Sequence, residues 1–543
     1  CLETLTLLAQ KAALWPSISL LERDHLGPIP RVQLSVKISA LSPHLDPIDP
    51  EGSYRSVAVR LRPILDLAMR LPASLIFDME QADTKTLLVE IFTRLFTEPS
   101  YKDYPYAGLA LQAYHRDTVR DIEELLAWVR RRGVPITLRL VKGAYWDSDT
   151  IRYRQRGWAA PLFEHKVETD ANYESLTYLM LSQSSLIRPA FGTHNLRTLA
   201  YIEAVAESLK LPPETWEYQM IFGMAEPFQH AVMQYGRRLR LYTPVGELLP
   251  GMAYLVRRLL ENTSNESFLR KEYVESHPLS ALLAPPVLEE PRQQDPPPLL
   301  SHHADIQEFR NEPQRDFAQA DSRTAMKQAL ATVLSQLNRQ WTSSSRGLSL
   351  TGPLIESRNP GRPNEVVGRL SSASSVDVEQ AVHRAVQARE SWRDATTERR
   401  VDILRTAATL MRTRRDELAA WEIVECGKPW READADVAEA IDFLEFYAAD
   451  WRRIAPPRRL GQEPGELNQR LYSPRGVTAV IAPWNFPLAI PTGMVSAALV
   501  TGNPVVFKPS ERSPMMGHWL TEILWEAGVP DGVLMCLQGG PEI

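Results

Sequence analysis

Cysteine is scarce in this chain of 543 residues. The three cysteines, Cys1, Cys426 and Cys536, lie far apart and form no Cys-x-x-Cys pair. A disulfide framework needs an even set of cysteines at regular spacings. The sequence therefore predicts no such framework, and it predicts no metal site. The scarcity favours a reducing, cytoplasmic setting.

An excess of positive charge is also absent. The chain has 61 Lys and Arg against 67 Asp and Glu, a net charge of −6. This balance excludes a strongly basic nucleic-acid footprint and a polybasic membrane signal. With 44% hydrophobic and 24% charged residues, the composition is that of a globular protein. The length predicts about three or four domain-sized units.

An uninterrupted membrane-spanning run is missing as well. Residues 476–507 carry no charged side chain and would be long enough to cross a bilayer. However, they contain Pro483, Pro487, Pro491 and Pro504. A lipid-facing helix could not satisfy its backbone around these prolines. We therefore expect short buried strands joined by loops.

Glycine is outnumbered by proline, 26 residues to 42, and the prolines concentrate in residues 278–298. Such a run favours extended, unpacked chain. We therefore divide the sequence into residues 1–272, a linker at 273–318 and residues 319–543. The first residue is not Met and the last residues stop in a strand-then-glycine pattern, so we expect the chain to be cut at both ends.

Residues 1–272 alternate short apolar runs with amphipathic helical stretches, which is typical of parallel α/β structure. A closed barrel of this kind has eight strands. An open doubly wound sheet would show a glycine-rich phosphate turn after an early strand, and none is present. We predict a (β/α)8 barrel that lacks its first strand, lost upstream of Cys1. The seven strand candidates are residues 32–38, 74–80, 108–114, 136–144, 188–195, 217–224 and 239–246.

Polar side chains stand where these apolar runs end. The carboxyl ends of barrel strands form the rim that carries the chemistry, although each residue alone could equally be a strand-end cap or a surface ion pair. Ten such residues at one level of seven strands favour a functional rim. They are Lys37, Asp78, Gln112, Arg139, Lys142, Thr193, His194, Asn195, Gln219 and Tyr242.

A further polar group lies on one predicted helix. Tyr254, Arg257, Arg258 and Glu261 have the spacing i, i+3, i+4, i+7, so they share one helical face. A solvated face with an Arg–Glu pair would explain this pattern. An anion clamp would explain it as well, since paired guanidinium groups match a carboxylate. The spacing alone leaves both open.

Long ordered motifs in residues 1–272 resemble the proline dehydrogenase domain of the bifunctional proline utilization A family. The motifs are SVKISAL, DMEQ, LALQAY, RLVKGAYWD, FGTHN, YQMIFGM and YTPVGELLPGMAYLVRRLLENTSNESFLR. The resemblance implies a barrel that holds FAD and oxidises L-proline to Δ1-pyrroline-5-carboxylate. We expect the electron acceptor for the flavin to be a membrane quinone.

The resemblance also implies roles for single residues. The proline carboxylate would be bound by Arg257, Arg258 and Lys37. The proline ring would be walled by Tyr242, Tyr254 and Ile221. The residues that would line the flavin are Gln112, Arg139, Val141, Lys142, Gly143, Ala144, Trp146, Lys166, Thr193, His194, Asn195, Gln219 and Glu261.

Two further implications concern charge at this site. Asp78 would support the active-site lysine and arginines. Arg139 and Lys142 would stabilise charge that develops on flavin reduction. One position departs from the family pattern, because Glu164 stands where the family commonly has Thr. The role of that position is therefore in doubt.

Residues 319–543 begin with helical patterns and end in an α/β pattern. Helical periodicity dominates 375–452, and a helical bundle without function would explain that stretch alone. VTAVIAP, PTGMVSAALVTG and PVVFKPSE then predict strand, helix and strand, a unit typical of a nucleotide-binding parallel sheet. We predict the N-terminal part of an α/β NAD-binding domain.

The motifs IAPWNFP, VVFKPSE, NPGRPNEVVG and ECGK resemble the aldehyde dehydrogenase superfamily. The resemblance implies that Pro483 and Trp484 lie along NAD, and that Asn485 donates a hydrogen bond to a thiohemiacetal oxyanion. It also implies that Lys508 and Glu511 contact the adenosine ribose. In the intact protein this domain would oxidise glutamate semialdehyde to L-glutamate.

That second reaction needs a nucleophilic cysteine and a general-base glutamate. Cys426 and Cys536 lack the glycine-rich setting of such a nucleophile, and we expect both to be packed thiols. The required elements normally lie downstream of this point in the superfamily. We therefore do not expect the second activity from these residues alone.

Two other functions remain as alternatives. One is a proline-responsive DNA-binding regulator, which the acidic balance opposes. The other is a non-catalytic scaffold derived from the enzyme, which the set Lys37, Arg257 and Arg258 opposes. We also expect a homo-oligomer, no nucleic-acid contact within these residues, and a cytoplasmic location peripheral to the inner face of the membrane.

Overall fold

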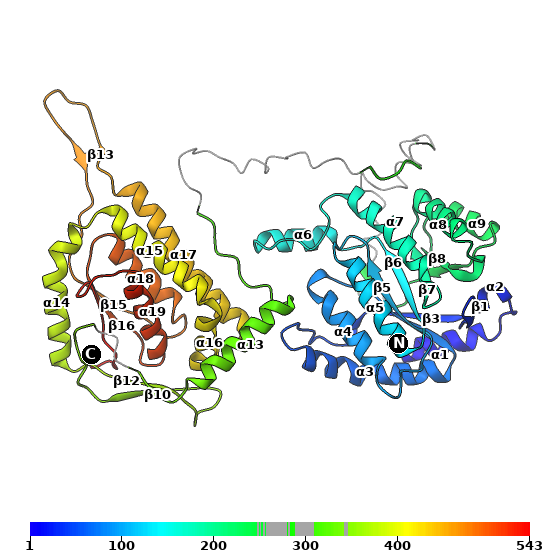
Figure 1. Ribbon diagram of the computed structural model, residues 1–543, viewed down its shortest axis with the longest axis horizontal. Helices are drawn as coiled ribbons and strands as arrows, with labels where there is room; N and C mark the ends of the chain where they lie inside the picture. The colour runs from blue at the N-terminus through cyan, green and yellow to red at the C-terminus, as the bar shows by residue number, and fades with distance from the viewer. Residues whose placement is uncertain are drawn as a thin grey trace. The chain divides into compact units, whose positions relative to one another are not determined.

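The computed structural model divides the chain into two compact units, residues Cys1–Pro297 and Pro298–Ile543 (Figure 1). The structure describes residues 1–246, 249, 251–252, 256, 280, 283–287, 309–341 and 346–543. Each unit is described by itself below.

The first unit is built on a parallel seven-stranded sheet whose strands pair in chain order. The strands are β3 (Val32–Val36), β4 (Ala73–Phe77), β5 (Ala107–Gln112), β6 (Ile136–Val141), β7 (Ile187–Gly192), β8 (Glu217–Ile221) and β9 (Leu239–Tyr242). Every residue of β4 and β5 is buried, as expected of parallel strands covered on both faces. All seven predicted strands are therefore confirmed.

Helices follow the strands and cover the sheet. They are α3 (Pro50–Arg70), α4 (Lys85–Leu95), α5 (Thr118–Arg132), α6 (Trp146–Gln155), α7 (Lys166–Ser182), α8 (Leu196–Ser208) and α9 (Glu226–Gln234). In α5, Ile122, Leu125, Leu126 and Val129 are buried because the i, i+3, i+4, i+7 spacing puts them on one face. Before the sheet come α1 (Leu2–Ala12), α2 (Ser19–Glu22), β1 (Arg23–Asp24) and β2 (Gly27–Pro28).

The sheet curls far enough for its two ends to touch through side chains. In the described chain, β3 and β9 share no backbone pairing. Gln219 Nε2 nevertheless donates to Gln33 Oε1 at 3.2 Å, and Arg240 Nη1 donates to the Arg31 carbonyl at 3.5 Å. Arg238 Nη1 donates to the Arg23 carbonyl at 3.0 Å. These bonds form a seam across the open side of the curled sheet, which agrees with the predicted incomplete barrel.

The second unit combines a helical layer with a small parallel sheet. Its helices are α13 (Ala320–Ser335), α14 (Ser375–Arg393), α15 (Thr397–Thr413), α16 (Arg415–Cys426), α17 (Trp430–Ile454), α18 (Ala489–Val500) and α19 (Pro514–Glu526). The parallel sheet is β15 (Thr478–Ile481), β16 (Val505–Lys508) and β17 (Leu534–Cys536). The predicted strand–helix–strand unit is confirmed as β15, α18 and β16.

Smaller sheets complete the second unit. One contains β10 (Arg339–Gln340), β12 (Val366–Ser371) and β11 (Leu354–Arg358), in that order. The other is a hairpin of β13 (Arg458–Arg459) and β14 (Gln469–Arg470). Across the described ranges, no helix combines the length and the apolar character that a membrane crossing requires. Residues 476–507 instead form short elements joined by loops, as their prolines predict; α18 and β16 are mostly buried, whereas β15 is partly exposed.

The joining segment 309–317 is bonded to the second unit. Phe309 packs edge-on against Phe446, with ring centroids 5.6 Å apart. The backbone N–H of Glu312 donates to Asp442 Oδ1 at 2.6 Å, and that of Arg315 donates to Asp434 Oδ2 at 2.7 Å. This part of the expected linker thus lies along α17.

Candidate active site

Asp78 is the centre of the polar cluster at the carboxyl ends of the strands. It follows β4 directly and is 6% exposed. Its carboxylate accepts hydrogen bonds from Arg139, from Ser35 Oγ at 2.6 Å and from the Tyr242 hydroxyl at 3.2 Å. Lys37 Nζ lies 3.6 Å from Asp78 Oδ2. The chain thus brings four predicted or neighbouring polar residues onto one carboxylate.

These partners keep Asp78 ionised. Burial alone would raise its pKa, but the charges of Arg139 and Lys37 and the hydrogen bonds from Ser35 and Arg139 hold that pKa below the ordinary value. Arg139 also lies over the Tyr242 ring, 5.7 Å from its centroid, so the cation has an aromatic partner as well. Its Nε is buried without a hydrogen-bond partner. This N–H is available to an acceptor.

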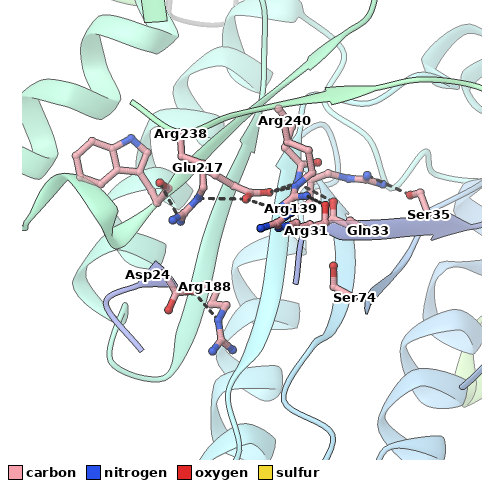
Figure 2. A network of polar contacts seen from close by, with 12 residues as sticks. Asp24, Arg31, Gln33, Ser35, Ser74, Arg139, Arg188, Glu217, Arg238 and Arg240 are labelled. Carbon is pink, nitrogen blue, oxygen red and sulfur yellow. Dashed lines mark hydrogen bonds and ion pairs between the residues drawn. The ribbon is translucent and has the colours of Figure 1, made fainter. Parts of the chain in front are cut away.

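Figure 2 shows a second network, deeper in the curled sheet. Glu217 accepts from Arg240 Nε at 3.0 Å, and its Oε2 lies 3.4 Å from Arg238 Nε. Gln219 Nε2 donates to Glu217 Oε1 at 2.6 Å. Burial raises the pKa of Glu217, but the two arginines and Gln219 lower it to about 2. Gln219, a predicted flavin residue, is therefore held in place by a permanent carboxylate.

Two lysines beyond β6 share one carboxylate. Lys142 Nζ contacts Asp170 Oδ1, and Lys166 Nζ donates to Asp170 Oδ2 at 2.6 Å. Burial lowers the pKa of Lys142, while the charge of Asp170 opposes that effect. The trio keeps an excess positive charge. Asp170 was not predicted from the sequence, although its i, i+4 spacing from Lys166 was visible.

The loop after β6 is built around a glycine. Gly143 has a φ of +135°, and a Cβ there would lie 1.3 Å from the Tyr114 ring. Only glycine fits this close approach. Ala144 is exposed and Val141 half-buried. Trp146 is 37% exposed, and its Nε1 donates to the Phe163 carbonyl at 2.8 Å.

The remaining predicted rim residues make fixed local contacts. Gln112 Nε2 donates to the Glu80 carbonyl at 3.2 Å. His194 Nε2 accepts from the backbone N–H of Ile221 at 2.9 Å, so a neutral ring carries its proton on Nδ1. Asn195 caps α8 by accepting from the backbone N–H of Thr198 at 3.0 Å. Thr193 is 6% exposed.

Tyr254, Arg257, Arg258 and Glu261 lie outside the described residues. Glu164, the departure from the family pattern, is exposed, and its Oε1 lies 3.9 Å from Arg116 Nη2. Such an exposed pair contributes little stability.

In the second unit, the predicted cofactor loop follows β15. Pro483, Trp484 and Asn485 are all exposed, and Trp484 is 47% exposed. The Arg512 guanidinium lies over the Trp484 ring, 5.6 Å from its centroid. Lys508 ends the neighbouring strand β16, and its Nζ lies 4.0 Å from Glu511 Oε2. These side chains stand at the carboxyl ends of β15 and β16, where parallel sheets bind ligands.

Two of the cysteines have thiol pKa values raised by burial. Burial, followed by the charges of Glu425 and Glu422, raises the pKa of Cys426. Burial raises the pKa of Cys536 to about 12. A nucleophilic thiol needs the opposite shift. The expectation that both are packed thiols agrees with these positions.

Comparisons with known proteins identify a family for each of the two units. Residues 1–271 match the family model for proline dehydrogenase, and residues 349–543 match that for the aldehyde dehydrogenase family. The bifunctional protein PutA of Klebsiella aerogenes is 33% identical over 529 residues, covering 94% of this chain and 39% of that protein. The chain thus spans well under half the length of this relative.

Two further relatives cover the chain differently. The 1-pyrroline-5-carboxylate dehydrogenase of Geobacillus kaustophilus is 42% identical over 240 residues, 44% of this chain and 47% of that protein. The crystal structure of proline utilization A from Bdellovibrio bacteriovorus, inactivated by N-propargylglycine, is 41% identical with a TM-score of 0.92. That match covers 100% of this chain and 56% of the solved chain.

Both family models, in this order along one chain, and the similarity to proline utilization A across almost the whole chain give one conclusion. The chain belongs to the bifunctional proline utilization A family, with a proline dehydrogenase domain followed by aldehyde dehydrogenase residues.

Proposed function

We propose that the first unit carries out FAD-dependent oxidation of L-proline to Δ1-pyrroline-5-carboxylate. The observation that carries the proposal is the convergence of Lys37, Arg139 and Tyr242 on the buried carboxylate of Asp78. This cluster places two cations and an aromatic ring at the carboxyl ends of parallel strands, where barrels carry their chemistry. A small amino acid with a carboxylate and an apolar ring suits such a site.

The residues present also fit a flavin dinucleotide. Lys142 and Lys166 share a single carboxylate, so they can balance an anionic pyrophosphate. Arg139 has a buried N–H without a partner, which suits an acceptor atom of a flavin ring. Gly143 has no side chain, so the backbone can pass close to the Tyr114 ring. When bound, FAD would supply the hydride acceptor for oxidation beside the proline nitrogen.

Each residue of the proposed proline site then has a defined task. Lys37 binds the proline carboxylate, together with Arg257 and Arg258 by family resemblance. Tyr242 packs against the ring of the substrate. Asp78 orients Lys37 and Arg139 and stays ionised while doing so. Arg139 and Lys142 stabilise negative charge that develops during the reaction.

For the second unit we propose a part in NAD-dependent oxidation of glutamate semialdehyde to L-glutamate. Trp484 and Pro483 would lie along NAD, Lys508 and Glu511 would bind its ribose, and Asn485 would donate to the oxyanion. The position of this loop at the ends of β15 and β16 supports the proposal. In this assignment one chain holds residues for two consecutive oxidations, and the second needs residues beyond those of this chain.

Family membership is also the basis for proposing an electron acceptor, a cellular location and an oligomeric state. Electrons from the reduced flavin would pass to a membrane quinone, and the protein would work in the cytoplasm, peripheral to the inner face of the membrane. We also propose a homo-oligomer. Sedimentation measurements and a quinone-reduction assay with liposomes would test these proposals.

A flavin experiment tests the first activity. The protein completed with the predicted first strand should be yellow with bound FAD, and it should reduce a dye in the presence of L-proline. Arg258→Met should raise the KM for proline by roughly 10²-fold, since one charge-assisted contact to a carboxylate is worth about 2–3 kcal/mol. Flavin content should hardly change. Arg237, which pairs with Glu203 through a contact of 2.5 Å, offers a matched Arg→Met control. Normal proline binding by Arg258→Met would contradict the anion clamp.

Nucleotide titration tests the second unit. Lys508→Ala should weaken NAD⁺ binding by about 1–3 kcal/mol, the range for a lost hydrogen bond to a charged group. Asn485→Ala should leave NAD⁺ affinity unchanged, because its proposed task concerns the oxyanion. Calorimetry on the chain can measure both. Equal losses in the two variants would contradict this division of roles.

A further inference from the structure

The loop that carries Asn485 leads into a helix that lacks a cap of its own. Helix α18 has Leu488 at its N-cap, no side-chain cap bond and no acidic residue in its first turn. Helix starts need partners for their first N–H groups. Here the partner comes from another helix, since Asp436 Oδ1 of α17 accepts from the backbone N–H of Ala489 at 2.7 Å.

The same carboxylate is joined to a buried cation. Lys428 Nζ contacts Asp436 Oδ2, and it lies 3.3 Å from Glu422 Oε2. Burial, and then the charge of Asp436, raises the pKa of Glu422 well above its ordinary value. Lys428 Nζ therefore lies between two buried carboxylates, one from α16 and one from α17. The side chains of Glu422 and Asp436 are fully buried, and that of Lys428 is 10% exposed.

Lys428 also contacts the loop that carries Asn485. Its Nζ lies over the Phe486 ring, 4.6 Å from the centroid, and a cation withdrawn from water attracts an aromatic face strongly. On the other side of Asn485, Arg512 lies over Trp484. The residues before and after Asn485 are thus each covered by a cation.

Helices α17 and α18 also pack closely, which restricts movement of α18 relative to α17. A Cβ added at Gly493 of α18 would lie 3.1 Å from the Phe443 ring of α17. This contact sets the distance between the two helices. If the Asp436–Ala489 hydrogen bond is lost, α18 therefore cannot move closer to α17 to form another one.

We propose that Asp436 and Lys428 are positioning residues that hold the 484–489 loop and thereby place the side-chain amide of Asn485. The inference rests on the proposed function, because the placement of Asn485 matters for its role as an oxyanion donor. An oxyanion donor acts only when it is held in place before the charge develops. The exposed position of Asn485 explains why the anchor comes from the residues around it.

Fluorine NMR of the chain labelled with fluorotryptophan gives a direct readout, with the Trp484 resonance assigned by Trp484→Phe. Asp436→Asn should shift or broaden this resonance and speed amide exchange at Ala489 by about 10- to 100-fold. Asp434→Asn is the matched control, because Asp434 is equally buried on the same helix but binds Arg415 and the 309–317 segment. It should leave both signals unchanged.

A second pair of variants separates positioning from general loss of stability. Lys428→Met should move the Trp484 resonance, whereas Lys428→Arg keeps a cation over Phe486 and should restore it. An unmoved resonance in Asp436→Asn, or an equal shift in Asp434→Asn, would overturn the inference. These spectra need no nucleotide. Absence of NAD⁺ binding by the wild-type chain would therefore count against the proposed function alone.

Discussion

Asp78 and Arg139 form an ion pair across the inside of the curled sheet, and each side chain is less than a tenth exposed. Asp78 follows β4 and Arg139 lies in β6, so the pair spans the intervening strand β5. Removing one member of a buried pair leaves an unpaired charge in a poorly polarisable interior. The stability of the first unit should therefore depend on both members together.

Arg139→Met should lower the free energy of unfolding of the first unit by about 3–5 kcal/mol, the usual cost of breaking a buried pair. The double variant Asp78→Asn with Arg139→Met should recover part of that loss, because it removes both buried charges and leaves only the partly exposed Lys37 cation without its partner. Urea denaturation of the single and double variants measures the coupling. Purely additive losses would show that the pair is not energetically coupled.

Lys142→Met should reduce FAD retention by about 10- to 100-fold, because the side chain would lose a charged contact to an anionic cofactor. The visible flavin absorbance after gel filtration reports the retained fraction. Lys102→Met provides the control, since Lys102 is 56% exposed and its Nζ lies 3.9 Å from Asp103. Equal flavin retention in the two variants would argue against a pyrophosphate at the Asp170 trio.

Glu425 should make the second unit less stable as the pH rises. Burial raises its pKa to about 7, despite hydrogen bonds from Ser357 and from the backbone N–H groups of Met515 and Met516. In the unfolded chain the carboxyl titrates near its ordinary pKa of 4.5. The stabilisation is therefore complete below pH 4.5 and declines as the pH rises to about 7.

The decline should total about 3 kcal/mol, from a shift of roughly two to three pKa units. Glu425→Gln should remove it, so the difference between the wild-type and variant unfolding curves isolates this carboxyl. That subtraction also cancels the opposite trend from His518, whose pKa burial lowers to about 4. Glu379→Gln, at an exposed position of α14, should leave the wild-type slope intact.

Alkylation should modify only Cys1 in the native chain. Cys1 is exposed, whereas Cys426 and Cys536 have pKa values raised by burial, and the thiolate is the reactive form. Mass spectrometry after iodoacetamide treatment counts the adducts, and the urea-unfolded chain should take up three. Rapid native labelling of Cys426 would reopen the question of a nucleophile in these residues.

Central strands such as β4 and β5 could be predicted from the sequence because both of their faces are covered. The runs in β4 and β5 are mostly apolar, are buried throughout and lie between helical patterns. The predicted ranges extended past the observed strand ends. They included Lys37, Asp78 and Gly143, which follow β3, β4 and β6. Strand β11 was not predicted, since its sequence LIESR is short and mostly polar.

The rim could be predicted, but its internal pairing could not. The motif positions indicated Lys37, Asp78 and Arg139, and alternation along the strands puts such residues on the inner face. Ser35 and Glu217 were missed because their importance depends on how far the sheet curls. Asp170 was missed although its i, i+4 spacing from Lys166 is visible in the sequence. The Asp436–Ala489 bond was likewise hidden, since 53 residues separate its ends.

The seam between the two ends of the curled sheet has a consequence for synthesis on the ribosome. Each strand pairs with the next one along the chain, so the sheet can grow strand by strand as the polypeptide emerges. The seam bonds join positions 186 to 215 residues apart. They must wait until β8 and β9 have left the exit tunnel. Until then the polar groups of Arg23, Arg31 and Gln33 lack these partners, so a pause in translation before β8 would delay closure of the curled sheet and raise the demand for chaperones.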